Sequence, residues 1–233
     1  MIRMVVSSFY NTLIDYEEAI PTSTMLEIDR IRNKNVLFTI STNGLYKEIL
    51  EYNKSYPFVD YIISLNGSCI YDVINSKCIY KQKIAKNDVK KIYNSFKNYK
   101  INYYTENSIL NKYNETLNKD IYKIEIVGYS DTSINSINCN LSVLEKDNEK
   151  YLEITSNKCN SYISVNKISE INNIKDDELL VIIGNDSDIE LGKKIKNSYR
   201  IANSSDKVKK AISKKTVSNN EHGVEKIIQS VIK

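Results

Sequence analysis

The sequence lacks any long apolar stretch. No apolar run approaches the roughly 18 residues that a membrane-spanning helix requires. The first residues reach charged Arg3 and then polar Ser7 and Ser8, and they do not form the apolar centre of a signal peptide. We therefore expect a cytoplasmic protein with no membrane partner.

The sequence also has few residues that bind metals through sulfur or imidazole. It contains four cysteines and a single histidine, His222, and no two cysteines form a Cys-x-x-Cys pair. A structural zinc site needs four clustered cysteine or histidine ligands, so we do not expect one. In a cytoplasmic chain the four thiols are expected to be free and mostly buried. They are Cys69, Cys78, Cys139 and Cys159.

A strong excess of either charge is missing as well. The net charge of +4 is small and is spread over many lysines and acidic residues, so we expect no nucleic-acid partner. Hydrophobic residues make up 41% of the chain and charged residues 27%, which is ordinary for a globular protein. A chain of 233 residues is long enough for one large domain or for a core with a smaller domain.

Strands and helices alternate in the first part of the chain. An apolar run at Met4 to Val6 ends abruptly in small polar residues, which indicates a buried strand that opens into a loop. Two further strands that end in polar turns, and two helices, follow; we expect the strands at 35–41 and 59–65 and the helices at 21–33 and 45–52. Alternation of this kind favours a parallel sheet. Right-handed connections would then place Ser8, Thr42 and Asn66 at the same edge of the sheet.

The middle of the chain follows a different pattern. A short hairpin is expected over residues 69–80, and Asn87 is expected to cap a helix. Extended stretches then dominate, with one short helix at Ser133 to Ile137; the stretches are 101–105, 121–127, 140–144 and 151–155. This pattern predicts an α+β insert with an antiparallel sheet.

Alternation returns near the end of the chain. A helix is expected over Tyr162 to Asn172, followed by a buried strand over Leu179 to Ile183 and a helix that Asp188 caps. The fold class is therefore α/β, with a Rossmann-like parallel sheet, helices on both faces, and an inserted α+β domain. The predicted division is a core at 1–80 and 159–233 and an insert at 81–158.

The order of these segments resembles the Cof-type branch of the haloacid dehalogenase (HAD) phosphatases. The resemblance covers the whole chain and is carried by ordered runs at 5–14, 38–44, 64–71, 151–155, 182–191 and 203–224. It implies a Rossmann-like core with an α/β cap over the site. It also implies magnesium-dependent hydrolysis of small phosphate esters through an aspartyl-phosphate.

The residues that this chemistry needs are replaced. A carboxylate must attack phosphorus, and a second carboxylic acid must protonate the leaving oxygen. The family begins with Asp-x-Asp-Gly-Thr, whereas this chain has Ser8 at the nucleophile position and Tyr10 at the acid/base position. The family lysine aligns with Ser161, unless a register shift brings in Lys158 or Lys167.

The metal-binding motif is also reduced. The resemblance puts Asn185 at the first ligand position and retains Asp188, which leaves too few carboxylates for tight binding of Mg²⁺. We therefore expect no cofactor, or Mg²⁺ if any activity remains. Thr12, Thr42, Asn66 and Gly67 are retained. The residues expected to bind a ligand are Asn11, Thr12, Thr42, Asn43, Gly44, Asn66, Gly67, Ser161 and Ser187.

Several of these residues have an ordinary structural explanation. Thr12 and Thr42 serve either as remnants of phosphate binding or only as turn residues, and Asp186 and Asp188 serve either as metal ligands or as helix caps. Six of the tyrosines in the insert could stack on bases, but we interpret them as half-buried residues of the insert and its sheet. They are Tyr93, Tyr99, Tyr103, Tyr104, Tyr113 and Tyr122. His222 is interpreted as a surface loop residue.

Three hypotheses for the function follow. The first is a pseudophosphatase, catalytically inactive, that binds a phosphorylated metabolite or a partner protein. The second is a weak or redirected magnesium-dependent hydrolase of small phosphate esters, which would use Asp15, Asp186 or Asp188 in unfamiliar roles. The third is a protein-interaction module with no small ligand.

Overall fold

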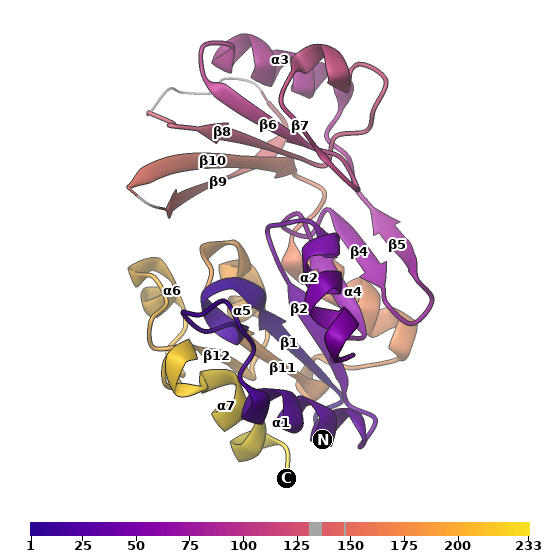
Figure 1. The fold of residues 1–233 in the computed structure, drawn as a ribbon, viewed down its shortest axis with the longest axis vertical. Coiled ribbons are helices and arrows are strands. Elements are labelled where there is room, and N and C mark those ends of the chain that lie inside the picture. The colour runs from indigo at the N-terminus through magenta and orange to yellow at the C-terminus, as the bar shows by residue number, and fades with distance from the viewer. Residues whose placement is uncertain (131–136, 147) are drawn as a thin grey trace.

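The computed structural model describes residues 1–130, 137–146 and 148–233. These residues form two sheets, which lie one above the other in Figure 1. The lower sheet has seven strands in the order β12-β11-β1-β2-β3-β4-β5, and the upper sheet has five in the order β7-β6-β8-β10-β9. Because the middle of the chain forms the upper sheet, the lower part, here called the core, is discontinuous, and the upper part, here called the cap, is inserted into it.

The centre of the core sheet is parallel. β1 lies between β11 and β2, β12 and β3 flank them in the same direction, and the hairpin of β4 and β5 adds an antiparallel edge. The strands are β1 (Met4–Ser8), β2 (Leu37–Ser41), β3 (Tyr61–Ser64), β4 (Cys69–Asp72), β5 (Lys77–Lys81), β11 (Leu179–Ile183) and β12 (Ser198–Arg200). This arrangement brings the carboxyl ends of β1, β2 and β3 to one edge, as the alternation predicted.

Helices cover both faces of the core sheet, because side chains alternate between its faces. Val5 of β1 packs in one apolar cluster with α1, α2 and α7, while its neighbours Met4 and Val6 pack in a second cluster with α4, α5 and α6. The helices are α1 (Thr22–Arg32), α2 (Tyr46–Ser55), α4 (Ser161–Asn172), α5 (Ile189–Lys194), α6 (Asp206–Ala211) and α7 (Gly223–Val231). Short helical turns are η1 (Phe9–Leu13), η3 (Asp176–Glu178), η4 (Asp186–Asp188) and η5 (Asn219–Glu221).

The cap is an antiparallel sheet with one helix on its far face (Figure 1). Ile92 and Phe96 of the helix pack on alternate strand residues such as Ile124 and Ile154, so the intervening strand residues face the core. The elements are α3 (Lys86–Phe96), β6 (Lys100–Tyr104), β7 (Ile109–Leu110), η2 (Tyr113–Thr116), β8 (Lys123–Val127), β9 (Cys139–Lys146) and β10 (Glu149–Ser156).

The fold class predicted from the sequence is confirmed, with local corrections. Asn87 does not cap α3: the helix begins at Lys86, and the residue before it, Ala85, makes no side-chain cap. The short strand β7 was not predicted, and the helix expected at Ser133 to Ile137 falls almost entirely outside the described residues. The four cysteines are unpaired, as expected. The boundaries at 80/81 and 158/159 stay a prediction.

No helix within the described ranges is both long enough and apolar enough to cross a membrane.

Candidate functional site

The loop after β1 is held in a sharp turn at the carboxyl edge of the sheet. Asn11 adopts a left-handed backbone conformation with φ of 55°, which asparagine tolerates better than most residues. The carbonyl oxygen of Tyr10 accepts two side-chain hydrogen bonds, from Thr12 Oγ1 and from Asn185 Nδ2, each at 3.2 Å. Thr12 and Asn185 therefore fix the loop that the resemblance identifies as the nucleophile loop.

A buried carboxylate lies beside this loop, and three serine hydroxyls surround it. Ser8 donates to Asp188 Oδ2 at 2.6 Å, while Ser41 and Ser161 donate to Asp188 Oδ1 at 2.8 and 2.6 Å. The hydroxyls of Ser41 and Ser161 also lie 3.2 Å apart. All four residues are at most 2% exposed. We call Ser8, Ser41, Ser161 and Asp188 the hydroxyl–carboxylate cluster.

The fold itself brings the cluster together. Ser8 and Ser41 are the last residues of β1 and β2 and pair directly across the parallel register. Ser161 is the first residue of α4, whose start is fixed by the Asn160 side chain, which accepts from Ile163 N at 2.8 Å. Asp188 ends the short turn after β11. Each residue thus stands at the ligand-binding edge of an open α/β sheet.

Asp188 is the N-cap residue of the following helix, α5, as expected, but its side chain makes no capping hydrogen bond. Both oxygens of its carboxylate accept serine hydroxyls instead.

The cluster contains no compensating cation. No salt bridge to Asp188 is formed by any residue that the structure describes. The two lysines that a register shift could have brought in lie elsewhere: the Lys167 ammonium sits 4.7 Å from the centre of the Tyr80 ring, and Lys158 is exposed. Ser161 therefore supplies a neutral hydroxyl where the family resemblance implies a lysine.

The residues near Asp188 do not fit a magnesium site. Mg²⁺ requires near-octahedral oxygen coordination, and both Asp188 oxygens already accept hydroxyl donors. The Asn185 amide is turned to donate to Tyr10, and Asp186 lies 3.3 Å from Lys207 Nζ. Within the described residues, no group of three or more acidic, histidine or cysteine side chains is arranged to hold a metal ion.

The Tyr10 side chain is hydrogen-bonded to Glu48, which is not a member of the hydroxyl–carboxylate cluster. Its hydroxyl donates to Glu48 Oε2 at 2.7 Å, and Glu48 Oε1 accepts from the backbone N–H of Leu45 at 3.2 Å. Burial, and then the hydrogen bond to Glu48, raise the pKa of Tyr10 well above the usual range. A Cβ at Gly44 would collide with the Glu48 carboxylate, so the glycine makes room for this pair.

A second buried carboxylate, Glu153 of β10, joins the cap to the core. It accepts from Lys123 Nζ at 2.8 Å, from Asn43 Nδ2 at 3.0 Å and from Asn66 Nδ2 at 2.9 Å. Burial alone raises the pKa of Glu153, but the Lys123 ammonium and the amide donors outweigh it and hold that pKa below its usual value. Lys123 also lies 4.2 Å from the centre of the Tyr104 ring.

This contact uses two residues that were predicted to bind a ligand. Asn43 and Asn66 follow β2 and β3 in the core, and both side chains donate to Glu153 of the cap. The carbonyl oxygen of the Asn66 side chain is buried and has no partner among the described residues. We call Asn43, Asn66, Lys123 and Glu153 the cap seam.

The remaining predicted residues stabilise turns. Thr42 Oγ1 accepts from Gly44 N at 3.1 Å, and the carbonyl oxygen of Gly67 accepts from Ser164 at 2.9 Å. Gly67 has φ of 88°, and a Cβ there would collide with the Asn160 backbone. Ser187 is half-buried in the turn that ends at Asp188. Of the predicted ligand-binding set, only Ser161 belongs to the hydroxyl–carboxylate cluster.

Three residues at these sites were not predicted from the sequence. Ser41, one residue before the predicted Thr42, supplies the hydroxyl that reaches Asp188. Lys123 and Glu153 are charged residues in strands, and their alternation with apolar residues that pack under α3 was a signal that both face the core.

His222 lies in a polar contact that is not a catalytic triad. Its Nδ1 is 3.1 Å from Ser23 Oγ and 3.3 Å from Glu225 Oε2. A triad needs the serine and the acid on opposite ring nitrogens, whereas here both contact Nδ1. The structure therefore provides no serine nucleophile activated by His222.

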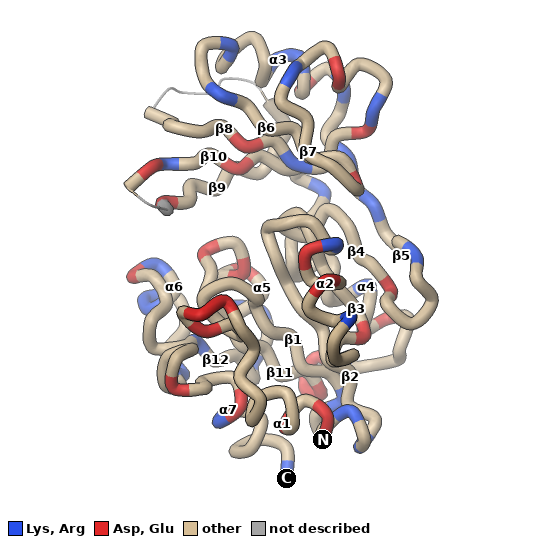
Figure 2. The backbone as a smooth tube through the Cα atoms, in the orientation of Figure 1, with Lys and Arg blue, Asp and Glu red and all other residues tan. Residues whose placement is uncertain are grey.

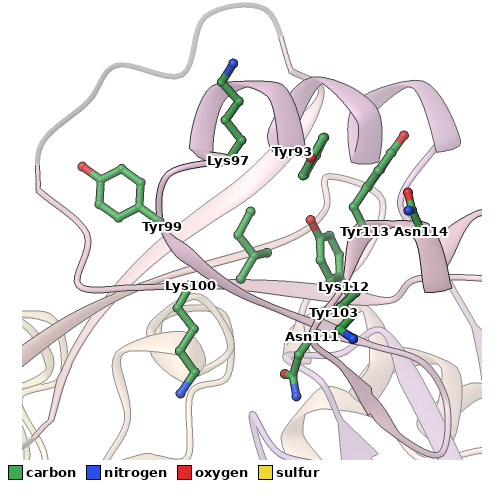
Figure 3. A pocket seen from close by; sticks show the side chains of 10 residues that line it. Tyr93, Lys97, Tyr99, Lys100, Tyr103, Asn111, Lys112, Tyr113 and Asn114 are labelled. Carbon is green, nitrogen blue, oxygen red and sulfur yellow. The ribbon is translucent and has the colours of Figure 1, made fainter.

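A hollow in the cap lies on the far side of its sheet from the core. Its volume is about 380 Å³, and four tyrosines and three lysines contribute to its lining. Two of the tyrosines, Tyr93 and Tyr113, stack on each other with ring centres 4.1 Å apart. Figure 3 shows Lys97 and Lys100 pointing out of the hollow in opposite directions, so their charges do not converge on one point.

Three comparisons place this architecture among known proteins. A putative phosphatase from Buchnera aphidicola subsp. Baizongia pistaciae is 33% identical over 92 residues, which is 40% of this chain and 34% of that protein. The chain thus aligns with about a third of the length of that curated relative. A haloacid dehalogenase-like hydrolase from B. subtilis has the same fold, with a TM-score of 0.89, 13% identity, and coverage of 99% of this chain and 100% of that one.

A HAD subclass IIB sugar phosphatase also shares the fold, with a TM-score of 0.85, 17% identity and coverage of 98% of both chains. The family model described as haloacid dehalogenase-like hydrolase matches residues 10–138 and 111–228. The structural neighbours show the fold, and the family match extends over most of the sequence. This chain belongs to the haloacid dehalogenase-like hydrolase family.

Proposed function

We propose that this protein is a HAD-like pseudophosphatase, which does not catalyse phosphoryl transfer and acts by binding a partner. The observation that carries the proposal is the hydroxyl–carboxylate cluster, in which Asp188 accepts Ser8, Ser41 and Ser161. These contacts occupy the edge of the sheet where the family resemblance implies a nucleophile, a metal and a lysine.

In the part that the structure describes, the chain has neither a suitable nucleophile nor a suitable general acid for the family reaction. Ser8 is 1% exposed, and a serine hydroxyl is a weak nucleophile unless a base removes its proton. The neighbouring Asp188 carboxylate is not reserved for Ser8, because it also accepts hydrogen bonds from Ser41 and Ser161. Tyr10 is a poor acid, because its pKa is raised well above the usual range by burial and by Glu48.

The same charges disfavour a phosphorylated ligand in the core. A phosphate group would approach the Asp188 carboxylate, and no lysine or arginine among the described residues forms a salt bridge there to offset the repulsion. Of the two kinds of partner expected from the sequence, a phosphorylated metabolite and a partner protein, this geometry favours the partner protein.

Turnover of phosphate esters tests the proposal. Wild-type protein is incubated with Mg²⁺ and p-nitrophenyl phosphate, and then with a panel of sugar phosphates, beside the variants Ser8→Ala and Asp188→Asn. We expect the wild type and both variants to give the same background rate. Magnesium-dependent turnover that Ser8→Ala abolishes would overturn the proposal.

One observation favours the rival hypothesis of a redirected hydrolase. The 2.6 Å contact between Ser8 and Asp188 is the geometry of a nucleophile beside a base. Asp15, another candidate in that hypothesis, is already used as a turn acceptor for Glu17 N and Ala19 N. In the same assay this hypothesis requires loss of turnover in both Ser8→Ala and Asp188→Asn.

A further inference from the structure

The second half of the core concentrates positive charge. Residues 193–215 contain eight lysines and one arginine against a single aspartate, a net charge of +8. Because the whole chain carries +4, the rest of it carries −4. The small overall charge therefore hides a strong separation of charge along the chain.

These lysines lie on neighbouring elements of the core. α5 packs against α6, and Lys214 Nζ donates to the Lys196 carbonyl oxygen at 2.9 Å, which joins the turn after α5 to the loop after α6. Figure 2 shows basic segments along α6. All eight side chains belong to exposed residues; they are Lys193, Lys194, Lys196, Lys207, Lys209, Lys210, Lys214 and Lys215. We call this set the lysine surface.

Most of this charge is not neutralised within the protein. Lys207 lies 3.3 Å from Asp186 and Lys209 lies 3.5 Å from Asp206. The other six lysines form no ion pair with any described residue. Arg200, in contrast, donates to the backbone carbonyl oxygen of Ile212 and is partly buried.

We propose that the lysine surface binds the phosphodiester backbone of a nucleic acid. Proteins bind that backbone mainly by neutralising phosphates with lysine and arginine. A protein partner normally needs an apolar centre to its interface. Within the described residues, none of the exposed large apolar side chains lies between 189 and 216. A surface that offers positive charge without apolar contacts suits the phosphodiester backbone of a nucleic acid.

This proposal replaces the expectation of no nucleic-acid partner, which relied on the net charge of the whole chain. The proposed binding has no sequence preference, because the surface offers ammonium groups and no exposed aromatic platform. It does not depend on the loss of phosphatase activity, so either proposal can fail while the other stands.

The test is fluorescence anisotropy with a labelled single-stranded RNA of 20 nucleotides and with a duplex DNA of the same length. We expect binding to the wild type in 50 mM salt. Affinity should fall about 100-fold between 50 and 200 mM salt if about five phosphates of a single strand are neutralised. No binding of either nucleic acid in 50 mM salt would overturn the proposal.

Charge reversal locates the binding surface. The variant Lys194→Glu/Lys210→Glu/Lys215→Glu should lose at least 10-fold in affinity, and its salt slope should fall by about two. The control Lys77→Glu/Lys90→Glu/Lys119→Glu changes three exposed lysines outside the surface and makes the same change in net charge. We expect the control to stay within 2-fold of the wild type. An equal loss in both variants would contradict the proposal.

Two further arms keep the result interpretable. The glutamine variant Lys194→Gln/Lys210→Gln/Lys215→Gln removes charge without reversal and should lose about 5-fold, and a thermal melt of each variant verifies its fold. Polyglutamate and vesicles with anionic lipids serve as competitors. Unlabelled RNA is the reference competitor, and all competitors are compared at equal concentrations of negative charge. If polyglutamate or the vesicles displace the RNA at a lower concentration than unlabelled RNA does, the surface binds an acidic protein or a membrane instead, and the proposal is wrong.

Discussion

Asp188 of the core and Glu153 of the cap are both buried carboxylates, and they are stabilised in different ways. Glu153 accepts a lysine ammonium and two amides, whereas Asp188 accepts three serine hydroxyls and no cation. Glu153 forms an ion pair with Lys123, whereas Asp188 is stabilised only by hydrogen bonds from neutral serine hydroxyls. A buried carboxylate needs one or the other to remain in an apolar interior.

Among the described residues, neither of the two regions offers a free positive group to a phosphate. Phosphoryl transfer requires positive charge against the phosphate, and the positive group of the cap seam, Lys123, is already paired with Glu153. The cluster around Asp188 has hydroxyls where such charge would be needed. The cap seam therefore joins the cap to the core, and the proposed loss of catalysis depends on the hydroxyl–carboxylate cluster.

The largest loss of stability is expected when the ion pair between Lys123 and Glu153 is broken. Lys123→Met leaves Glu153 buried without its cation and should lower the free energy of unfolding by about 3–5 kcal/mol. The measurement is urea denaturation at pH 7. The double variant Lys123→Met/Glu153→Leu removes both charges and should recover part of the loss. A loss below about 1 kcal/mol in the single variant would mean that the pair is not buried as described.

A smaller effect is expected from adding charge to the other region. Ser8→Asp places a second carboxylate against Asp188, and the repulsion should cost about 2–3 kcal/mol in the absence of metal. Mg²⁺ at 10 mM should raise the melting temperature of this variant, because two facing carboxylates create a metal site. Ser8→Asn is the matched control without charge and should show no response to Mg²⁺. An equal response in both variants would contradict this account.

The smallest effect is the pH dependence of the cap seam. The pKa of Glu153 is lowered in the folded protein, so the unfolded chain binds more protons when the pH falls through the usual glutamate value of about 4.3. The contribution of Glu153 is therefore fully present above that pH and is lost below it. Thermal melts from pH 7 to pH 3 should show a steeper loss in the wild type than in Glu153→Gln. If the melting temperatures of both proteins fall in parallel with pH, Glu153 does not contribute to the loss of stability in acid.

The sequence was sufficient to predict the fold of the core because its signals are local. The buried run at Leu179 to Ile183 and the apolar run at Met4 to Val6 each define a strand by themselves. The carboxyl edge could be predicted as the site, because a parallel sheet brings its strand ends together. The replacement of charged groups at Ser8 and Tyr10 was visible only through the resemblance to the family's first motif.

The contacts within the site could not be predicted, because they join residues far apart in the sequence. Ser8 and Asp188 are 180 positions apart, and only the packed fold shows that they share a hydrogen bond. Asn43 and Asn66 had the pattern of ligand-binding residues, but the position of the cap turns both toward Glu153. The charge separation of the lysine surface was present in the sequence and was hidden by averaging over the chain.

The most direct test of the central claim is a calorimetric titration of the wild-type protein with Mg²⁺, beside Asp188→Asn. If Asp188 is fully used by Ser8, Ser41 and Ser161, both proteins should give the same heats, with no binding site saturating below 10 mM. A saturable site in the wild type that Asp188→Asn removes would show that the carboxylate is free to hold a metal ion, and it would contradict the account.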